Sequence, residues 1–197
     1  MNLPNDEEQI LNTTLSIAEI IDIEDNPIKT LKQAEAFQYM MLEYGAALKI
    51  VETKLDALDS EFNLRHARNP IESISTRLKT PDSIVEKMHR RGQPISIESI
   101  QKTLTDIAGA RVICSFLDDI YSLADMIENQ EDITVRVKKD YIAHPKENGY
   151  RSLHLIVSIP IYLSQGRKDI PVEIQFRTIA MEFWATLEHQ LRYKKGI

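Results

Sequence analysis

The chain is organised around one stretch, residues 146–159, with the sequence KENGYRSLHLIVSI. Its first half is polar, and Asn148-Gly149 is typical of a tight turn in which the glycine takes a positive φ. Its second half, 153–159, is apolar, and period-two alternation puts His154 on the face opposite its apolar neighbours. The stretch therefore predicts a ligand-binding loop on a core strand. An ordinary hairpin turn with an exposed Tyr150 is the alternative.

Composition restricts the class of protein. The chain has 197 residues and is 43% hydrophobic, which is enough for one good core with a helical appendage. No apolar run approaches the roughly 20 residues that span a bilayer, and the N-terminal MNLPNDEE is acidic where a signal peptide is basic. We therefore expect a cytoplasmic protein without a membrane partner. The single cysteine, Cys114, excludes an intrachain disulfide and is expected to be a core thiol.

Charge is distributed unevenly along the chain. Residues 1–61 carry 13 acids and 4 bases, whereas residues 62–197 carry 17 acids and 20 bases. The mildly basic second part suits small anionic ligands. The overall pI of about 5.4 lacks the broad basic field of a duplex-binding protein. Duplex nucleic acid is therefore not an expected partner, and single-stranded RNA is left open.

The N-terminal third predicts an acidic segment followed by a long helix. Residues 1–33 are acidic with scattered apolar residues, and we expect them to be partly ordered. Between Ala34 and Phe62 the apolar residues alternate in steps of three and four, which predicts a helix over 34–64 with a narrow apolar seam. This seam packs either on its own domain or on a partner subunit, and the sequence favours neither.

The next helix has clear boundaries and a basic surrounding. Thr80 can cap it, Pro81 fits its first position, and Gly92 fits its exit. Basic side chains gather in and before it: Arg77, Lys79, Lys87, Arg90 and Arg91. They form either an ordinary solvated face or a cradle for phosphate groups.

The remaining pattern alternates strands and helices. A strand over 111–116 is followed by a helix capped by Asp118, a strand near 133–137, and a hairpin that turns near 165–166 and returns over 170–176. Thr178 is expected to cap a final helix whose core side carries Ala180, Trp184, Leu187 and Leu191. This order predicts an α/β (α+β) fold, with a mixed β-sheet flanked by helices and a long N-terminal helix.

Two acids, Asp106 and Glu173, lie at or on predicted strands with polar faces. Two converging carboxylates are a common way to hold Mg²⁺; unrelated surface acids are the alternative. The six glycines form neither a Walker A loop nor a G-x-G-x-x-G fingerprint, so side chains and a metal would have to hold any nucleotide. The histidines lack metal-ligand spacing, which leaves a metal-dependent hydrolase unsupported.

Four ordered motifs carry a resemblance to a known family: Arg77…Lys87-x-x-Arg90, Asp106-Ile107-Ala108-Gly109-x-Arg111, Asn148-Gly149-Tyr150-x-Ser152-Leu153-His154 and Val172-Glu173-Ile174-Gln175-x-Arg177-Thr178. Over about residues 40–195 the chain resembles the synthetase domain of the RelA/SpoT family, and most of all the stand-alone small alarmone synthetases. The resemblance implies a nucleotidyltransferase-like domain over 34–197 and a homotetramer. It also implies transfer of pyrophosphate from ATP to the ribose 3′-hydroxyl of GDP or GTP, which gives ppGpp or pppGpp and AMP in the stringent response.

The resemblance further implies a role for each matching residue. Asp106 and Glu173 would hold Mg²⁺, and Glu173 would help to deprotonate the 3′-hydroxyl. The ATP site would take four basic residues, Arg77 and Arg111 at the adenine and Lys87 and Arg90 at the phosphates. The acceptor site would take five residues: Lys139, Lys146, Asn148, Tyr150 and His154. The competing hypothesis is a binding module that keeps this fold and holds a nucleotide or RNA without turnover.

Overall fold

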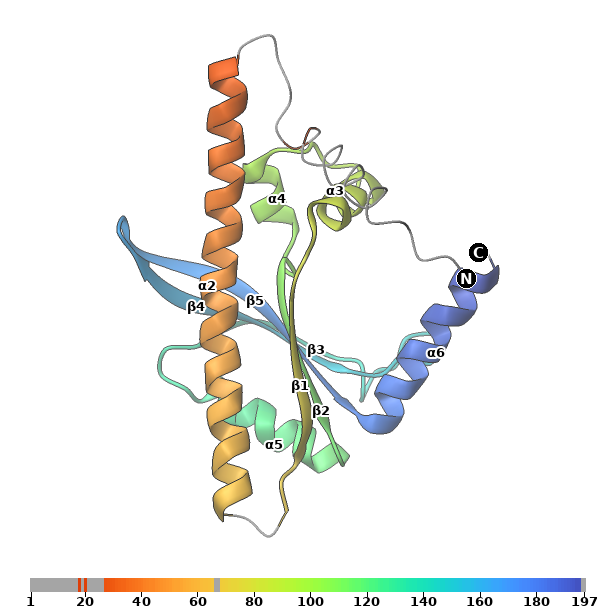
Figure 1. Ribbon diagram of the computed structural model, residues 1–197. Helices are drawn as coiled ribbons and strands as arrows, with labels where there is room; N and C mark the ends of the chain where they lie inside the picture. Colours follow the sequence, from red (N-terminus) through yellow and green to blue (C-terminus); the bar gives the residue numbers. More distant parts are fainter. Residues whose placement is uncertain (1–17, 19, 21–26, 66–67, 196–197) are drawn as a thin grey trace.

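The computed structural model describes residues 18, 20, 27–65 and 68–195 and contains a five-stranded sheet (Figure 1). The strands are β1 (Ile71–Leu78), β2 (Ala108–Cys114), β3 (Thr134–Asp140), β4 (Leu153–Leu163) and β5 (Gly166–Thr178), in the spatial order β1-β2-β5-β4-β3. The central pair β2 and β5 is parallel, and the other pairs are antiparallel. The predicted mixed α/β fold is confirmed.

The two faces of this sheet have different chemistry. On one face Val112, Ile174 and Leu155 are fully buried in the core. On the other face the register aligns Arg111 with Gln175 on β5, and Gln175 with His154 on β4. Since side chains alternate along each strand, one face builds the core and the other gathers polar groups.

The core face is covered by α2 (Pro27–Arg65), the long N-terminal helix. Its seam residues Phe37, Tyr44 and Val51 are buried in the same core cluster as the sheet, so the seam packs on its own domain. A part-buried ion pair adds to this packing, because the half-exposed Lys168 of β5 lies 2.6 Å from Glu43, whose side chain is only 4% exposed.

The helix begins at Pro27 and not at Ala34 as the periodicity predicted. Proline suits the first helical turn, and Ile28 and Leu31 continue the apolar spacing in steps of three before Ala34, so the predicted helix was too short at its start. Most of the acidic segment 1–33 lies outside the described residues.

Helix α3 (Pro81–Arg90) begins and ends where the sequence predicted. The Thr80 hydroxyl accepts a hydrogen bond from the Ser83 N–H at 3.3 Å, and Gly92 has a φ of 61°. Strand β1 and helix α4 (Ile97–Thr103) were not predicted. In β1 the residues Ile71 and Ile74 are three apart, which is a helical spacing. A register shift next to Ile71 places both against the core.

Strand β2 ends two residues before the predicted boundary. Phe116 was predicted to end this strand, but it lies outside the sheet and is 60% exposed. Helix α5 (Leu117–Glu128) follows at once, and the Asp119 carboxylate accepts the Phe116 N–H at 3.1 Å. The predicted cap at Asp118 is wrong, because Asp118 lies inside the first turn. Four apolar residues at helical spacing form the buried side of α5: Ile120, Leu123, Ala124 and Ile127.

Helix α6 (Ile179–Lys195) starts after Thr178, whose hydroxyl accepts the Met181 N–H at 3.3 Å as predicted. Its predicted core side is wrong, since Trp184, Leu187 and Leu191 are 44%, 36% and 49% exposed. Figure 1 shows α2 and α6 on opposite sides of strands β1 and β2. Because α2 already covers the apolar face of the sheet, α6 projects from its polar side.

No helix in the described ranges has both the length and the apolar character that a membrane crossing requires.

Candidate active site

A cavity of about 350 Å³ opens on the polar face of the sheet. Its walls include Arg77 from β1, Arg111 from β2, Glu173 and Gln175 from β5, and Asp106 from the segment before β2. The register explains this meeting, because Gly109 pairs with Arg77 on one side and with Glu173 on the other. Four of the predicted site residues therefore line one cavity: Arg77, Asp106, Arg111 and Glu173.

Asp106 lies between two lysines. Its Oδ2 atom is 2.6 Å from Lys87 Nζ and 3.1 Å from Lys79 Nζ. Burial by itself would raise the pKa of Asp106, but the hydrogen bond and charge of Lys87, together with Lys79, hold that pKa below its usual value. Asp106 is therefore a carboxylate at neutral pH, and Lys87, which was predicted to hold the phosphates of ATP, lies against this carboxylate.

The buried Lys79 is a residue to which the sequence assigned no individual role. Its side chain is 8% exposed, and its backbone N–H donates to the backbone carbonyl of Ile107, next to Asp106, at 2.8 Å. Only its place among the basic residues before α3 pointed to it. Burial of an ammonium group needs a paired anion, and Asp106 supplies it.

The Oδ1 atom of Asp106 is buried without a hydrogen-bond partner among the described residues. Asp106 is one of the residues that line the cavity, and an unpartnered carboxylate oxygen is suited to a cation. Glu173 lines the same cavity. The pKa of Glu173 is lowered overall; burial, followed by a smaller effect of the negative charge of Asp106, opposes this lowering, so the two carboxylates interact. Within the described ranges no group of three or more His, Cys, Asp or Glu side chains is placed to hold a metal. A cation here would take these two carboxylates and oxygens from a ligand.

Glu173 is held by two neighbours. Its Oε1 atom lies 3.1 Å from His154 Nδ1, and its Oε2 atom accepts a hydrogen bond from Gln175 Nε2 at 2.9 Å. Burial raises the pKa of Glu173, yet the hydrogen bond and charge of His154 and the Gln175 hydrogen bond leave it below the ordinary value. The carboxylate is therefore ionised at neutral pH and fixed in orientation.

The loop that contains Tyr150 lies beside this cavity. The Tyr150 hydroxyl is 2.8 Å from His154 Nε2 and accepts a hydrogen bond from Arg177 Nη2 at 2.7 Å. Lys146 Nζ lies 4.9 Å from the centre of the Tyr150 ring. Three of the predicted acceptor residues therefore touch one another, and His154 joins them to Glu173. The turn is as predicted, since Gly149 has a φ of 78°.

The other two predicted acceptor residues have different surroundings. Lys139 is exposed and pairs in register with His154 across β3 and β4. Asn148 is used by the protein itself: its Oδ1 accepts the Tyr150 N–H at 3.2 Å, and its Nδ2 donates to Glu188 of α6 at 3.1 Å. Asn148 therefore shapes the loop and ties it to α6.

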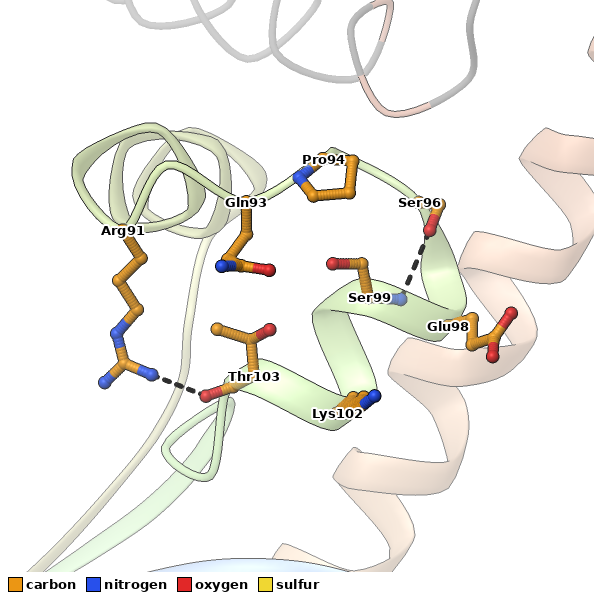
Figure 2. Close-up of a pocket in the computed structure, with 8 residues that line it drawn as sticks. All are labelled: Arg91, Gln93, Pro94, Ser96, Glu98, Ser99, Lys102 and Thr103. Atoms are coloured by element: carbon orange, nitrogen blue, oxygen red, sulfur yellow. Dashed lines mark hydrogen bonds between the residues drawn. The ribbon is translucent and has the colours of Figure 1, made fainter.

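The basic residues at the end of α3 diverge. Arg90 is exposed and is not among the residues that line the 350 Å³ cavity. Arg91 donates to the carbonyl of Thr103 at 2.6 Å, across a hollow between α3 and α4 that Figure 2 shows. The structure therefore brings Lys79 and Lys87 to Asp106 and turns Arg91 elsewhere.

A second ion-pair system joins the cavity to α6. Arg111 Nη1 donates to Glu182 Oε1 at 2.8 Å, and Arg177 Nη1 donates to Glu182 Oε2 at 2.6 Å. Arg177 is 6% exposed, so its charge is buried and paired. Sequence reasoning gave Glu182 no role. Its place on α6, four residues after Thr178, carries no motif, and only the fold brings it to Arg111.

Comparison with known proteins places this geometry in context. A family model described as the region found in RelA / SpoT proteins matches residues 76–197. GTP pyrophosphokinase YwaC of Bacillus subtilis is 44% identical over 160 residues, covering 81% of this chain and 76% of the relative. GTP pyrophosphokinase YjbM of the same organism is 42% identical over 164 residues, covering 83% of this chain and 74% of the relative.

Solved structures agree with this result. The small alarmone synthetase 1 from Bacillus subtilis bound to its product pppGpp superposes with a TM-score of 0.75 and 40% identity, and 83% of each chain is covered. The same synthetase bound to AMPCPP gives a TM-score of 0.68 and 34% identity, covering 82% of this chain and 80% of the other.

Proposed function

The chain belongs to the RelA/SpoT family, and on this premise we propose that it is a GTP pyrophosphokinase that makes the alarmones ppGpp and pppGpp. It transfers pyrophosphate from ATP to the ribose 3′-hydroxyl of GDP or GTP and releases AMP. The observation that carries this proposal is the meeting of Arg77, Arg111, Asp106 and Glu173 in one cavity, next to the Tyr150 loop.

In this proposal the cavity holds ATP. Arg77 and Arg111 line it from neighbouring strands, and their planar guanidinium groups suit an adenine ring between them. Lys87 receives the phosphates together with Lys79, because both ammonium groups already converge on Asp106. Arg90 joins them from the exposed end of α3, in agreement with the family motif.

Mg²⁺ is the proposed cofactor, held by Asp106 and Glu173. The buried, unpartnered Oδ1 of Asp106 and the two interacting carboxylates support this donor set, and phosphate oxygens and water would complete the octahedron that Mg²⁺ requires. When bound, the ion would neutralise charge on the triphosphate. Lys87 and Lys79 hold the Asp106 carboxylate in place beforehand.

The acceptor nucleotide lies against the Tyr150 loop in this proposal. Tyr150 offers a ring for stacking on guanine, and His154 and Asn148 fix the nucleotide. Lys146, already over the ring, and Lys139, beside His154, are close enough to meet its phosphates. GDP and GTP differ only at the phosphate end, so both fit the same loop.

Glu173 is the proposed base for the reaction. As the 3′-oxygen bonds to the β-phosphorus of ATP, the bond from that phosphorus to the α–β bridging oxygen breaks, and AMP leaves with the electron pair. The proton of the 3′-hydroxyl passes to the Glu173 carboxylate. His154 and Gln175 orient this carboxylate through both of its oxygens, which favours a fixed direction of approach.

A non-catalytic nucleotide- or RNA-binding module is the second candidate. Two ionised, buried carboxylates in a nucleotide cavity argue against it, since they repel phosphate unless a cation joins them. Incubation with radiolabelled ATP, GDP and Mg²⁺, followed by separation of the products, decides between the two. We expect labelled AMP when the α-phosphate of ATP carries the label, and a labelled guanosine tetraphosphate when the γ-phosphate carries it. Nucleotide binding without AMP would refute the synthetase.

We also propose a cytoplasmic homotetramer. The cytoplasm supplies ATP and GTP. The seam of α2 is buried in its own chain, so the contacts between subunits must come from elsewhere. Helix α6 offers exposed apolar side chains, with Phe183 at 68% and Leu191 at 49% exposure. Light scattering should give four times the chain mass, and a monomer would contradict the proposal.

A further inference from the structure

One side chain of helix α6, Glu182, contacts Arg111 in the wall of the cavity. Both of its carboxylate oxygens are occupied, Oε1 by Arg111 at 2.8 Å and Oε2 by Arg177 at 2.6 Å. The two arginines come from the parallel neighbours β2 and β5, where Ile113 pairs with Arg177 and Arg111 pairs with Gln175. Glu182 therefore pairs with two guanidinium groups that neighbouring strands hold, and its single negative charge offsets part of their combined charge.

The hydrogen bonds continue from Arg177 into the other half of the site. Its Nη2 atom donates to the Tyr150 hydroxyl at 2.7 Å and to Gln175 Oε1 at 3.1 Å. Gln175 in turn donates to Glu173 at 2.9 Å. An unbroken series of contacts thus joins Arg111 in the ATP cavity, through Glu182 and Arg177, to the acceptor loop.

The burial of these groups makes the carboxylate necessary. Arg177 is 7% exposed and Glu182 27% exposed at the side chain, and charges that have lost water depend on their partners. Without Glu182 two neighbouring cations would repel each other, and the flexible Arg111 would turn toward solvent. An arginine that is already held in place loses less conformational freedom when a ligand binds.

We propose that Glu182 is a positioning residue that fixes Arg111 for ATP and, through Arg177, Tyr150 for the acceptor nucleotide. One carboxylate on α6 thereby supports both substrate sites. The inference rests on the proposed synthetase function. It predicts that a change at Glu182 weakens the binding of both nucleotides, although Glu182 lines neither the cavity nor the Tyr150 loop.

The test is the substitution Glu182→Gln, which keeps the size of the side chain and removes its charge. Isothermal titration calorimetry would measure the Kd of α,β-methylene-ATP and of GDP. We expect each Kd to rise about tenfold, the loss expected for one charged hydrogen bond. At saturating substrates we expect kcat to fall less than about threefold, since Glu182 does not touch the reacting atoms. A purely structural role would instead lower Tm while leaving both Kd values unchanged, or would lower kcat by more than about threefold.

The matched control is Glu61→Gln, which removes a glutamate from a solvent-exposed pair with Arg65 on α2. It should leave both Kd values unchanged. A double-mutant cycle tests whether Glu182 acts on ATP binding through Arg111. If Glu182 acts on ATP through Arg111, then Glu182→Gln in the Arg111→Ala background should weaken ATP binding no further, yet still weaken GDP binding.

The outcomes separate this inference from the proposed function. A wild-type protein that makes no AMP and binds neither nucleotide would overturn both. A wild-type protein that makes AMP, with a Glu182→Gln variant that behaves as Glu61→Gln does, would overturn the inference alone. Loss of ATP binding with unchanged GDP binding would also overturn it, because the route through Arg177 would be absent.

Discussion

Replacement of Asp106 by asparagine should damage both activity and stability, for a reason that only the structure supplies. Asp106 is the anion for two lysines, Lys87 at 2.6 Å and Lys79 at 3.1 Å. The sequence alone suggests that this change removes metal charge and leaves the fold intact. In the structure it also leaves two ammonium groups, one of them buried, without their anion.

The magnitude follows from the burial of the three side chains. Asp106 is 19%, Lys87 20% and Lys79 8% exposed, so solvent screens the group only in part. Loss of one partner from a buried pair costs about 3–5 kcal/mol. The remaining exposure favours the lower end, about 3 kcal/mol of unfolding free energy. For a chain of this size about 3 kcal/mol corresponds to a Tm lower by roughly 6–12 °C.

Turnover should fall by more than the 10²- to 10³-fold typical of one lost electrostatic group. Differential scanning calorimetry would give Tm, and AMP release at saturating Mg²⁺ would give turnover. The control Asp118→Asn removes an exposed acid from the first turn of α5 and should change the unfolding free energy by less than about 0.5 kcal/mol.

A double variant separates the two effects. Lys79→Met removes the buried charge and keeps most of the side-chain volume, so Asp106→Asn combined with Lys79→Met should regain most of the lost Tm but none of the turnover. Asp106→Asn with a Tm within about 2 °C of wild type would refute the electrostatic reasoning. More than about a tenth of wild-type turnover would refute the metal site.

Three further predictions concern the same site. Glu173→Gln should lower AMP release by more than about 10²- to 10³-fold while calorimetry still detects binding of α,β-methylene-ATP; retained turnover would exclude Glu173 as base and metal ligand. Tyr150→Phe should raise the acceptor KM by about tenfold because Arg177 loses its acceptor, and Tyr150→Ala, which also removes the ring, should raise the acceptor KM by a further factor of about 5 to 150, the equivalent of one lost base stack; equal damage from both changes would contradict the stacking role. The folded-state pKa of Asp106 lies below its ordinary value, so the stabilising effect of Asp106 is complete above about pH 4 and is lost as pH falls through the folded-state pKa. The Tm difference between wild type and Asp106→Asn should therefore be constant from pH 7 to 5 and narrow below about pH 4. A Tm difference that stays constant down to about pH 2 would show that the pairs with lysine do not produce it.

The order of elements and the face of each strand were largely determined by the sequence. Alternation in 153–159 and 170–176 reports a local backbone geometry with period two, so Leu155 and Ile174 were placed in the core correctly. Thr80, Pro81 and Gly92 act through their own backbone and side chain, and the boundaries of α3 followed from them. Local signals of this kind do not depend on distant residues.

The failures lie where tertiary contacts override local pattern. The apolar residues of α6 have a helical spacing, but that spacing does not reveal whether a sheet face remains to be covered. Helix α2 takes that face, so Trp184 and Leu187 stay exposed. In the same way β1 has the spacing of a helix and becomes a strand by pairing with β2. Periodicity shows which residues lie on the same face of a helix or strand, whereas tertiary packing determines whether that face contacts the core or solvent.

The site shows the same division. The sequence supplied the charges and the turn, and motif resemblance selected Asp106, Glu173 and Tyr150 among many polar residues. Only the tertiary structure decided that Lys79 is buried on Asp106 and that Glu182 joins Arg111 to Arg177. The cause is geometric: the 71 positions that separate Arg111 from Glu182 are closed by strand pairing and by the direction in which α6 leaves β5, and no local pattern encodes either.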